Sequence, residues 1–444
     1  MSENDNFTMA EAIAEAKRCL NCKVPQCKMG CPIGNEIPQW VHELSMGNLG
    51  NSISIINTRS NLPAVCGRVC GHERQCEGHC VLNKKGKHIE IGKLERFVAD
   101  FDTKMGLTHV AIPEKSRGSV AIIGTGPAGL TVAGELARRG FRITMFEMDH
   151  EPGGDLMFGI PEYRLPKSVV RAEIQKIKNL GVTIFCNTTV GRDITIDDIF
   201  ARGFDAIFIG SGTGKPKSAD IPGVGLKGVR HAIYFLRRME LFNDGFINRD
   251  EVYMDPGDRV YVVGGGNTAM DAARTAARLG ADVTVLYHRT QDRMAALKAE
   301  QEGAAADGVK FQFEASITDI VDTNGDGRLD QITIQSPEGT KTVPAERVLL
   351  AVGSVPASRI VSTTTGIDVD PKGYVLTRDE PYGMTSRKGV FAGGDVAHRP
   401  ATVVQAMGNA REVAEGIARY VDAIRLLDAV NEPNPTFNNA PGEN

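Results

Sequence analysis

Eight of the nine cysteines in this 444-residue chain lie between residues 19 and 80. They fall into two groups, C-x2-C-x4-C-x3-C (Cys19, Cys22, Cys27, Cys31) and C-x3-C-x5-C-x3-C (Cys66, Cys70, Cys76, Cys80). Short spacings of this kind let one loop place several thiolates around an inorganic core, and eight sulfurs are enough for two cores. The N-terminal part of the chain is therefore predicted to be organised by two metal centres.

Iron–sulfur clusters and zinc are the two alternatives for these centres. Structural zinc sites usually use paired C-x2-4-C knuckles, and the x4 and x5 gaps in the middle of the two groups fit that pattern poorly. Cys31-Pro32 repeats the Cys-Pro end of a ferredoxin-type run, in which the last cysteine serves the other cluster. The pattern favours iron–sulfur, but the spacing alone leaves open which four ligands share a cluster.

Composition excludes several other classes of protein. The net charge of −4 gives no basic excess for nucleic acid, and the apolar runs are too short for membrane insertion. The polar, acidic N-terminus lacks the features of a signal peptide, so we expect a cytoplasmic protein. In that reducing compartment a cysteine cluster binds metal more often than it forms disulfides.

A dinucleotide-binding motif begins at Gly124. It is G-x-G-x-x-G, follows the apolar strand SVAIIG and opens a helix, and its residues are Gly124, Gly126, Pro127, Ala128 and Gly129. Glycines here allow the tight turn, the approach of a pyrophosphate and close packing of helix on strand. Glu147 ends the next strand, where an acid binds a ribose hydroxyl.

The far end of the chain indicates FAD as the first cofactor. The strand GVFAGGDV ends in Gly394 and Asp395, and a helix begins at Thr402 and Val403. In flavoproteins with two dinucleotides such an acid binds the ribityl or pyrophosphate part, and the helix N-terminus faces the flavin.

A second motif, G-x-G-x-x-A, follows the strand RVYVVGG and comprises Gly264, Gly266, Asn267, Thr268 and Ala269. Arg289 and Arg293 follow its second strand, where an NAD site would have an acid. Arginine suits the 2′-phosphate of NADP, so NADP(H) is favoured and NAD(H) stays open.

Two strand–glycine-loop–helix units predict an α/β fold with a helical and loop-rich iron–sulfur domain followed by two Rossmann-type domains, the second inserted in the first. We expect an iron–sulfur domain at 1–115, an FAD domain at 116–250 and 346–428, an NAD(P) domain at 251–345 and a disordered tail at 429–444.

Nearly the whole chain resembles one family of iron–sulfur flavoproteins. That family includes the glutamate synthase small subunit, the large subunit of NADH-dependent reduced ferredoxin:NADP oxidoreductase, and the N-terminal half of dihydropyrimidine dehydrogenase. The matching segments include RCLNCKVPQCKMGCPIGNEIP, CGRVCGHERQCEGHC, GKLERF, PGGDLMFGIPEYRLPK, VVGGGNTAMDAAR and FAGGDV.

The resemblance implies ligands and flavin contacts. One 4Fe–4S cluster would use Cys19, Cys22, Cys27 and Cys80; the other would use Cys31, Cys70, Cys76 and Glu95. Cys66 is left without a ligand role. Gly154, Leu156, Arg164 and Val190 are further candidate FAD contacts.

These features predict an NAD(P)H-dependent oxidoreductase that passes electrons from NADPH through FAD and two clusters to a second subunit or a ferredoxin, in a hetero-oligomer. No side chain is predicted to act as a general acid or base. The segment GKLERFVAD favours the bifurcating ferredoxin:NADP transhydrogenase; glutamate synthase and a dihydropyrimidine dehydrogenase subunit are the alternatives. A disulfide reductase is disfavoured because the flavin domain contains no C-x-x-C pair.

Overall fold

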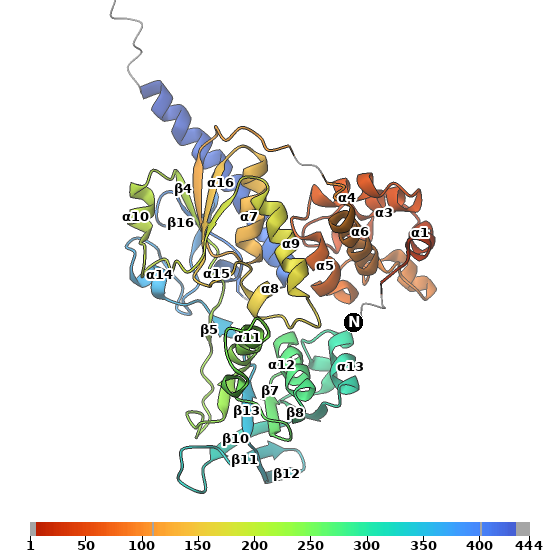
Figure 1. Ribbon diagram of the computed structural model, residues 1–444, viewed down its shortest axis with the longest axis vertical. Coiled ribbons are helices and arrows are strands. Elements are labelled where there is room, and N and C mark those ends of the chain that lie inside the picture. The colour runs from red at the N-terminus through yellow and green to blue at the C-terminus, as the bar shows by residue number, and fades with distance from the viewer. Residues whose placement is uncertain (1–5, 109–110, 400–401, 432–444) are drawn as a thin grey trace, which may run out of the picture.

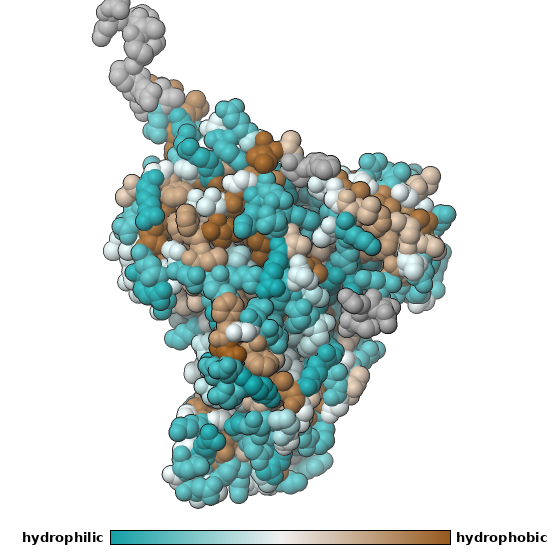
Figure 2. Space-filling model, viewed as in Figure 1, coloured by the Kyte–Doolittle hydropathy of each residue, from teal (hydrophilic) through white to brown (hydrophobic). Residues whose placement is uncertain are grey.

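The computed structural model describes residues 6–108, 111–399 and 402–431. Figure 1 shows three regions: a helical N-terminal region, a larger region built on a seven-stranded sheet beside it, and a third region below with a five-stranded sheet. This confirms the predicted α/β fold class. Hydrophilic residues cover much of all three regions on the face in Figure 2. Within the described ranges, no helix combines the length and apolarity needed to cross a membrane.

The N-terminal region is built from short helices around one apolar core. Thr8 caps the first helix and forms a capping box with Glu11, which satisfies backbone N–H groups that have no partner within the helix. Trp40, Leu44 and Leu94 are fully buried in the core of this region. Its helices are α1 (Met9–Lys17), α2 (Gln26–Met29), α3 (Ile37–Ser45), α4 (Leu49–Asn57), α5 (Pro63–Val69), η2 (His72–Arg74), η3 (Val81–Lys85) and α6 (Ile91–Met105).

The first sheet has the order β15-β16-β17-β4-β1-β2-β3. Its strands from β17 to β3 run parallel, and β15 and β16 add an antiparallel edge. The strands are β1 (Ser119–Ile123), β2 (Arg142–Phe146), β3 (Thr183–Phe185), β4 (Ala206–Ile209), β15 (Thr377–Asp379), β16 (Tyr382–Thr385) and β17 (Val390–Ala392). The helices of this region are α7 (Pro127–Arg138), α8 (Asp155–Phe158), α9 (Lys167–Lys178), α10 (Ile196–Ala201), α14 (Arg359–Ser362), α15 (Asp395–His398) and α16 (Val403–Asn431).

In the sequence, the strands of the second sheet are inserted between two strands of the first sheet, β4 and β15. It is parallel with the order β6-β13-β7-β8-β9, and a three-stranded antiparallel sheet β10-β11-β12 packs near it. The strands are β6 (Val229–His231), β7 (Arg259–Val263), β8 (Asp282–Tyr287), β9 (Lys310–Phe313), β10 (Ser316–Val321), β11 (Gln331–Ser336), β12 (Gly339–Pro344) and β13 (Arg347–Leu350). The helices are α11 (Ala232–Asn243), η4 (Arg249–Val252), α12 (Asn267–Arg278), η5 (Gln291–Arg293) and α13 (Lys298–Ala306).

The inserted unit is larger than the predicted range 251–345. Strands β6 and β13 belong to its sheet, and Phe235 of α11 is buried in its core. The chain enters and leaves it side by side, through the antiparallel pair β5 (Lys215–Pro216) and β14 (Ser354–Val355). The predicted boundary at 250 is too late because β6 and α11 carry no glycine motif to mark them. Of the predicted tail 429–444, residues 429–431 end helix α16 and the remainder lies outside the described residues.

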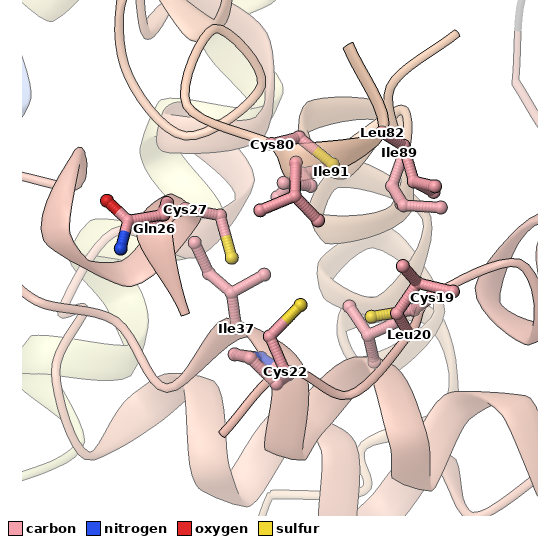
Figure 3. A pocket seen from close by; sticks show the side chains of 13 residues that line it. Cys19, Leu20, Cys22, Gln26, Cys27, Ile37, Cys80, Leu82, Ile89 and Ile91 are labelled. Atoms are coloured by element: carbon pink, nitrogen blue, oxygen red, sulfur yellow. The ribbon is translucent and has the colours of Figure 1, made fainter. Parts of the chain in front are cut away.

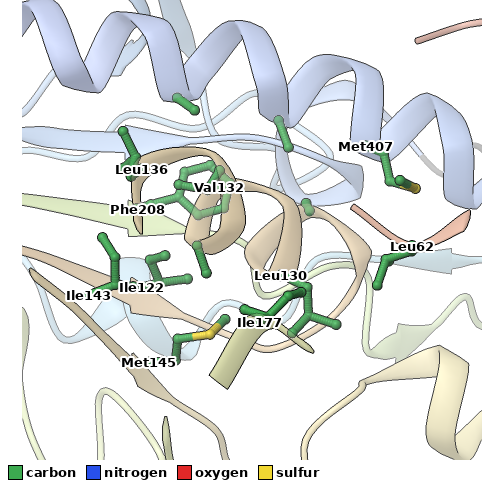
Figure 4. Close-up of a cluster of buried hydrophobic side chains, with 14 of the residues drawn as sticks. Leu62, Ile122, Leu130, Val132, Leu136, Ile143, Met145, Ile177, Phe208 and Met407 are labelled. Atoms are coloured by element: carbon green, nitrogen blue, oxygen red, sulfur yellow. The ribbon is translucent and has the colours of Figure 1, made fainter. Parts of the chain in front are cut away.

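One continuous core joins the helical region to the first sheet. Leu62 and Val65 of the helical region share a buried apolar cluster with Leu130 of α7 and Met407 of α16. Figure 4 shows Leu62 and Met407 at the same end of this cluster. The contact fixes the cysteine-bearing segments against α16, the helix predicted to face the flavin.

Candidate redox site

The first of two cysteine-lined cavities brings together Cys19, Cys22, Cys27 and Cys80. Three of these come from the loop and helix after α1, and Cys80 arrives 53 residues later at the start of η3. In Figure 3 their four sulfur atoms point toward one another. This is the set that the family resemblance assigns to one cluster.

The second cavity brings together Cys31, Cys70, Cys76 and Glu95, the other implied set. Asn35, His72 and Gln75 also line it, and sequence reasoning did not identify any of these three as part of a site. Cys66 lines it as well. Its Sγ lies 3.7 Å from the Sδ of Met407 and 3.8 Å from the Oγ of Ser60, so this thiol is buried and has its own contacts at the wall of the cavity.

The separation of the sulfurs fits a polynuclear cluster better than a single ion. A tetrahedral zinc with Zn–S bonds of about 2.3 Å would hold its sulfurs about 3.8 Å apart. Among the described residues, the one group of three or more such ligand atoms within 4.8 Å of one another is His150, Glu151 and Asp244, so no three cysteine sulfurs are that close. Each donor set therefore fits a 4Fe–4S cluster.

Burial favours the neutral form of at least one thiol in each cavity. Burial raises the pKa of Cys27 to about 11, and the thiols of Cys19 and Cys80 contribute in the same direction. Burial likewise raises the pKa of Cys31 to about 11, with a contribution from Glu95. Cluster ligands must be deprotonated, so a cluster bound in either cavity would displace protons from it.

Glu95 occupies an unusual position for a carboxyl group. It lies on the buried face of α6 with 7% of its surface exposed, and the Nδ2 of Asn35 is 3.5 Å from its Oε1. Burial, followed by the charge of Glu173, raises the pKa of Glu95 to about 8. A buried carboxyl group with so few polar partners is well suited to bind a cation.

The two cavities are adjacent, and the second lies closer to the first sheet region than the first does. They share Ile37 and Ile91 in their walls. Val404, near the start of α16, lines only the second cavity. The second cavity therefore lies between the first cavity and the N-terminus of α16.

The first glycine motif forms a cradle at the N-terminus of α7. Gly124 has a φ of +92°, and a Cβ on Gly129 would lie 2.1 Å from the Gly124 carbonyl oxygen, so both positions require glycine. A Cβ on Gly126 would meet no atom within 4 Å. This open space above Gly126, at a helix N-terminus that begins with Pro127, fits the pyrophosphate of FAD.

Two distant segments close around this cradle. A Cβ on Gly154 would lie 3.1 Å from the Cα of Gly126, and a Cβ on Gly394 would lie 2.8 Å from the Cβ of Ala128. Asp395 begins α15 directly after Gly394, and Thr402 caps α16 before Val403 through its hydrogen bonds with Gln405. The structure thus brings Gly154 and Gly394 against the glycine motif.

Glu147 is buried beside the cradle. Its carboxylate accepts hydrogen bonds from the Thr125 hydroxyl, from the Thr125 N–H at 3.0 Å and from the Asp149 N–H at 2.9 Å. Burial raises the pKa of this carboxyl, and its hydrogen bonds with Thr125 oppose that shift.

Three further predicted FAD contacts interact with other parts of the protein. The Arg164 guanidinium pairs with Asp271 at 2.8 Å and with Glu300 at 3.0 Å, so it joins the two sheet regions. Leu156 and Val190 are buried in separate apolar clusters.

The second glycine motif repeats the same geometry at α12. A Cβ on Gly264 would lie 2.5 Å from the Ala351 carbonyl oxygen, whereas a Cβ on Gly266 would meet nothing within 4 Å. The side chain of Asn267 accepts a hydrogen bond from the Leu297 N–H, and Ala269 is fully buried. Thr268 follows Asn267 in the first turn of α12.

The segment after β8 lies against this motif. The Tyr287 ring is 2.4 Å from where a Cβ on Gly265 would be, and its hydroxyl donates to the Arg293 carbonyl oxygen. Arg289 and Arg293, in the segment that follows β8, have exposed side chains. Their position fits a ligand that carries a phosphate near the adenosine ribose.

A direct link between the cysteine region and the second sheet region was not predicted. Arg74 donates two hydrogen bonds of 2.9 Å to the carbonyl oxygens of Ala295 and Ala296. The Lys298 N–H donates to the Glu73 carboxylate at 2.9 Å. The turn between Cys70 and Cys76 is thereby attached to the segment that follows Arg293.

Comparisons with known proteins agree with this arrangement. Residues 2–107 match the family described as dihydropyrimidine dehydrogenase domain II, 4Fe-4S cluster, and residues 118–410 match pyridine nucleotide-disulphide oxidoreductase. Two solved structures share the reductase fold only: FprA from Mycobacterium tuberculosis in complex with NADPH (TM-score 0.57, 18% identity, 70% of this chain and 86% of that one) and thioredoxin reductase from Lactococcus lactis (TM-score 0.53, 23% identity, 68% and 99%).

Curated relatives match over most of the chain. Glutamate synthase [NADPH] small chain from Halomonas elongata is 36% identical, covering 93% of this chain and 91% of the relative; the one from Escherichia coli is 34% identical, covering 94% and 93%. The NADP(+)-dependent formate dehydrogenase subunit beta from Moorella thermoacetica is 35% identical, covering 89% of this chain and 60% of the relative. The chain therefore belongs to the pyridine nucleotide-disulphide oxidoreductase family, in the group that carries an N-terminal 4Fe–4S domain and includes the glutamate synthase small chains, and it is an NAD(P)H-dependent oxidoreductase.

Proposed function

We propose that this chain is the NADPH-oxidising subunit of a larger complex and delivers electrons to a separate protein through two 4Fe–4S clusters. When bound, FAD accepts hydride from NADPH and gives up single electrons, which iron–sulfur clusters can carry. The first cavity would hold one cluster on its four cysteines. Cys31, Cys70, Cys76 and Glu95 would hold the other.

The observation that carries the proposal is the continuity of the two cavities with α16. Val404 of α16 lines the second cavity, and the Cβ of Ala406 in the same helix lies 3.9 Å from where a Cβ on Gly394 of the flavin cradle would be. Ile37 and Ile91 then separate the second cavity from the first. The chain's contribution is placement, since the protein sets the order and surroundings of its cofactors.

The nicotinamide cofactor would bind at Gly266 and the N-terminus of α12, with Arg289 and Arg293 beside the 2′-phosphate. This supports NADP(H) over NAD(H). Asp271 and Glu300 hold Arg164 between the two sheet regions and fix their relative position.

The glutamate synthase small chains support a glutamate-synthase-type partner, because they match this chain over more than nine-tenths of their own length. The segment GKLERFVAD favours the bifurcating ferredoxin:NADP transhydrogenase as the second candidate. A partner that co-purifies and supports glutamate formation would identify the chain as a glutamate-synthase-type subunit. A flavoprotein partner with its own iron–sulfur centre would identify it as a subunit of the transhydrogenase.

The experiment that tests the proposal is an anaerobic NADPH titration of the purified protein, with iron and flavin analysis. One FAD and two clusters should take up about four electrons per chain, against about two for a flavin alone. A protein that contains zinc, or that takes up only two electrons, would contradict the proposal.

A matched pair of variants tests the two nucleotide sites separately. A Cβ at Gly126 or Gly266 meets no protein atom, so Gly126→Ala and Gly266→Ala should both fold. Gly126→Ala should lose FAD, and Gly266→Ala should keep FAD but bind NADPH more weakly. Equal flavin content in the two variants would argue against the assignment.

A further inference from the structure

We propose that the rim of the first cavity is the docking surface for an acidic iron–sulfur electron carrier; this rests on the proposed function and names the kind of partner it serves. The rim consists of residues 17–31 and 80–89, the two segments that carry the four cysteines of the first cavity.

The charge of the rim is opposite to that of the chain as a whole. The two segments contain seven basic residues and no acidic residue, whereas the net charge of the chain is −4. The basic residues are Lys17, Arg18, Lys23, Lys28, Lys84, Lys85 and Lys87. Such a concentration of one sign raises the rate at which a partner of the other sign associates.

Part of this charge is available to a partner. Arg18 pairs with Glu15, and Lys28 pairs with Glu36 at 2.6 Å. Within the part of the chain that the structure describes, Lys23, Lys84 and Lys85 are exposed and have no carboxylate at ion-pair distance. Lys84 and Lys85 lie on η3, whose residues Val81 and Leu82 line the cavity itself.

Apolar side chains lie among these lysines. Leu20, Val24 and Met29 are 56%, 66% and 71% exposed, which is high for residues of this kind. Leu20 also lines the first cavity. An apolar centre surrounded by charge is the usual composition of a transient protein interface.

The second cavity has no comparable surface. Cys76 and Glu95 are each 7% exposed, α16 supplies part of the wall, and Arg74 attaches the neighbouring turn to the second sheet region. The path from a cluster to a partner protein is therefore shortest at the rim of the first cavity. A carrier with an acidic face around its own iron–sulfur centre complements that rim in charge.

The test compares two triple charge reversals of the holoprotein. Lys23→Glu/Lys84→Glu/Lys85→Glu changes the rim, and Lys341→Glu/Lys372→Glu/Lys388→Glu changes three exposed lysines elsewhere. The readout is the rate of NADPH-driven reduction of an acidic 2Fe–2S ferredoxin at low and high salt. Ferricyanide reduction and the EPR spectrum of the NADPH-reduced protein report on FAD and the clusters independently.

We expect the rim variant to lose at least about 10-fold in rate at low salt and to lose most of its salt dependence. The control variant should behave as the unchanged protein does. Equal rates in the two variants, or clusters that NADPH reduces but that pass no electrons to the ferredoxin, would overturn the docking surface. Clusters that NADPH does not reduce would instead count against the proposed function.

Discussion

The two cysteine cavities lie side by side but differ in ligands and in surroundings. The first has four thiols and an exposed, basic rim. The second has three thiols and Glu95, is enclosed by α6 and α16, and also contains the thiol of Cys66 in its wall. Ligand charge and solvent exposure both set the reduction potential of a cluster, so clusters in the two cavities should differ in potential and serve different electron-transfer steps. In the proposed function, the outer cavity would hold the cluster that exchanges electrons with a partner, and the inner cavity the cluster that exchanges them with the flavin.

The largest expected effect comes from removing a ligand of the first cavity. Cys27→Ser should lose about half of the iron, and electron transfer to a carrier should fall by more than about 100-fold, beyond the losses seen when only supporting residues change. Reduction of ferricyanide by NADPH through the flavin should persist. Iron analysis and steady-state rates measure both.

Cys186→Ser is the matched control, since this half-buried cysteine lies in the first sheet region, away from both cavities. Iron content should be unchanged. If Cys27→Ser kept all of its iron, Cys27 would not be a ligand.

A second prediction separates the two cavities by potential. Glu95→Gln keeps an oxygen donor but removes a negative charge. Removal of this charge stabilises the reduced cluster relative to the oxidised one. The midpoint potential of the inner cluster should rise, and that of the outer cluster should stay the same. EPR-monitored redox titration measures both; a shift of the outer cluster alone would reverse the assignment.

A third prediction concerns the additional thiol in the second cavity. Cys66→Ser should keep the full iron content and both cluster signals, and it should lower the free energy of unfolding by about 1 kcal/mol, because the buried contact with Met407 is lost. Cys70→Ser, four residues away, should lose the inner cluster. Iron loss in Cys66→Ser would make Cys66 a ligand in place of Glu95.

The smallest expected effect is on the pH dependence of cluster assembly. Raised pKa values, about 11 for Cys27 and Cys31, mean that binding displaces protons and that affinity rises with pH in both cavities. Above pH 8 Glu95 is already ionised, because its pKa is about 8. The inner cavity then releases one proton fewer, so its affinity should rise less steeply there.

Chelator competition from pH 6 to pH 9 measures these slopes. In the cluster-free protein the same raised pKa should lower stability as pH increases from 4.5 toward about 8, since the folded state holds the Glu95 proton longer than the unfolded chain. Equal slopes for the two cavities above pH 8 would contradict the role of Glu95.

Local motifs were predictable because their residues are neighbours in the sequence. The requirement for glycine at 124 and 129 follows from backbone geometry, and the structure gives both the expected close contacts. The family, the fold class and the insertion of one Rossmann unit in the other are confirmed.

Long-range features could not be derived from spacing. Cys27 and Cys31 are four residues apart yet face different cavities, because the short helix α2 ends between them. Cys80 returns to the first cavity only through the fold of residues 32–79. Arg164 is bound by Asp271 and Glu300 from a different sheet region, and no local pattern indicates that pairing.

The most direct test of the account is the order of the two clusters, measured by EPR after anaerobic addition of NADPH to Cys80→Ser and Cys76→Ser proteins, with dithionite as the reference reductant. In Cys80→Ser, NADPH should still reduce the remaining inner cluster. In Cys76→Ser, dithionite should reduce the remaining outer cluster but NADPH should not, because the connection to the flavin is missing. Reduction by NADPH of the outer cluster in Cys76→Ser, together with an unreduced inner cluster in Cys80→Ser, would contradict the order proposed for this chain.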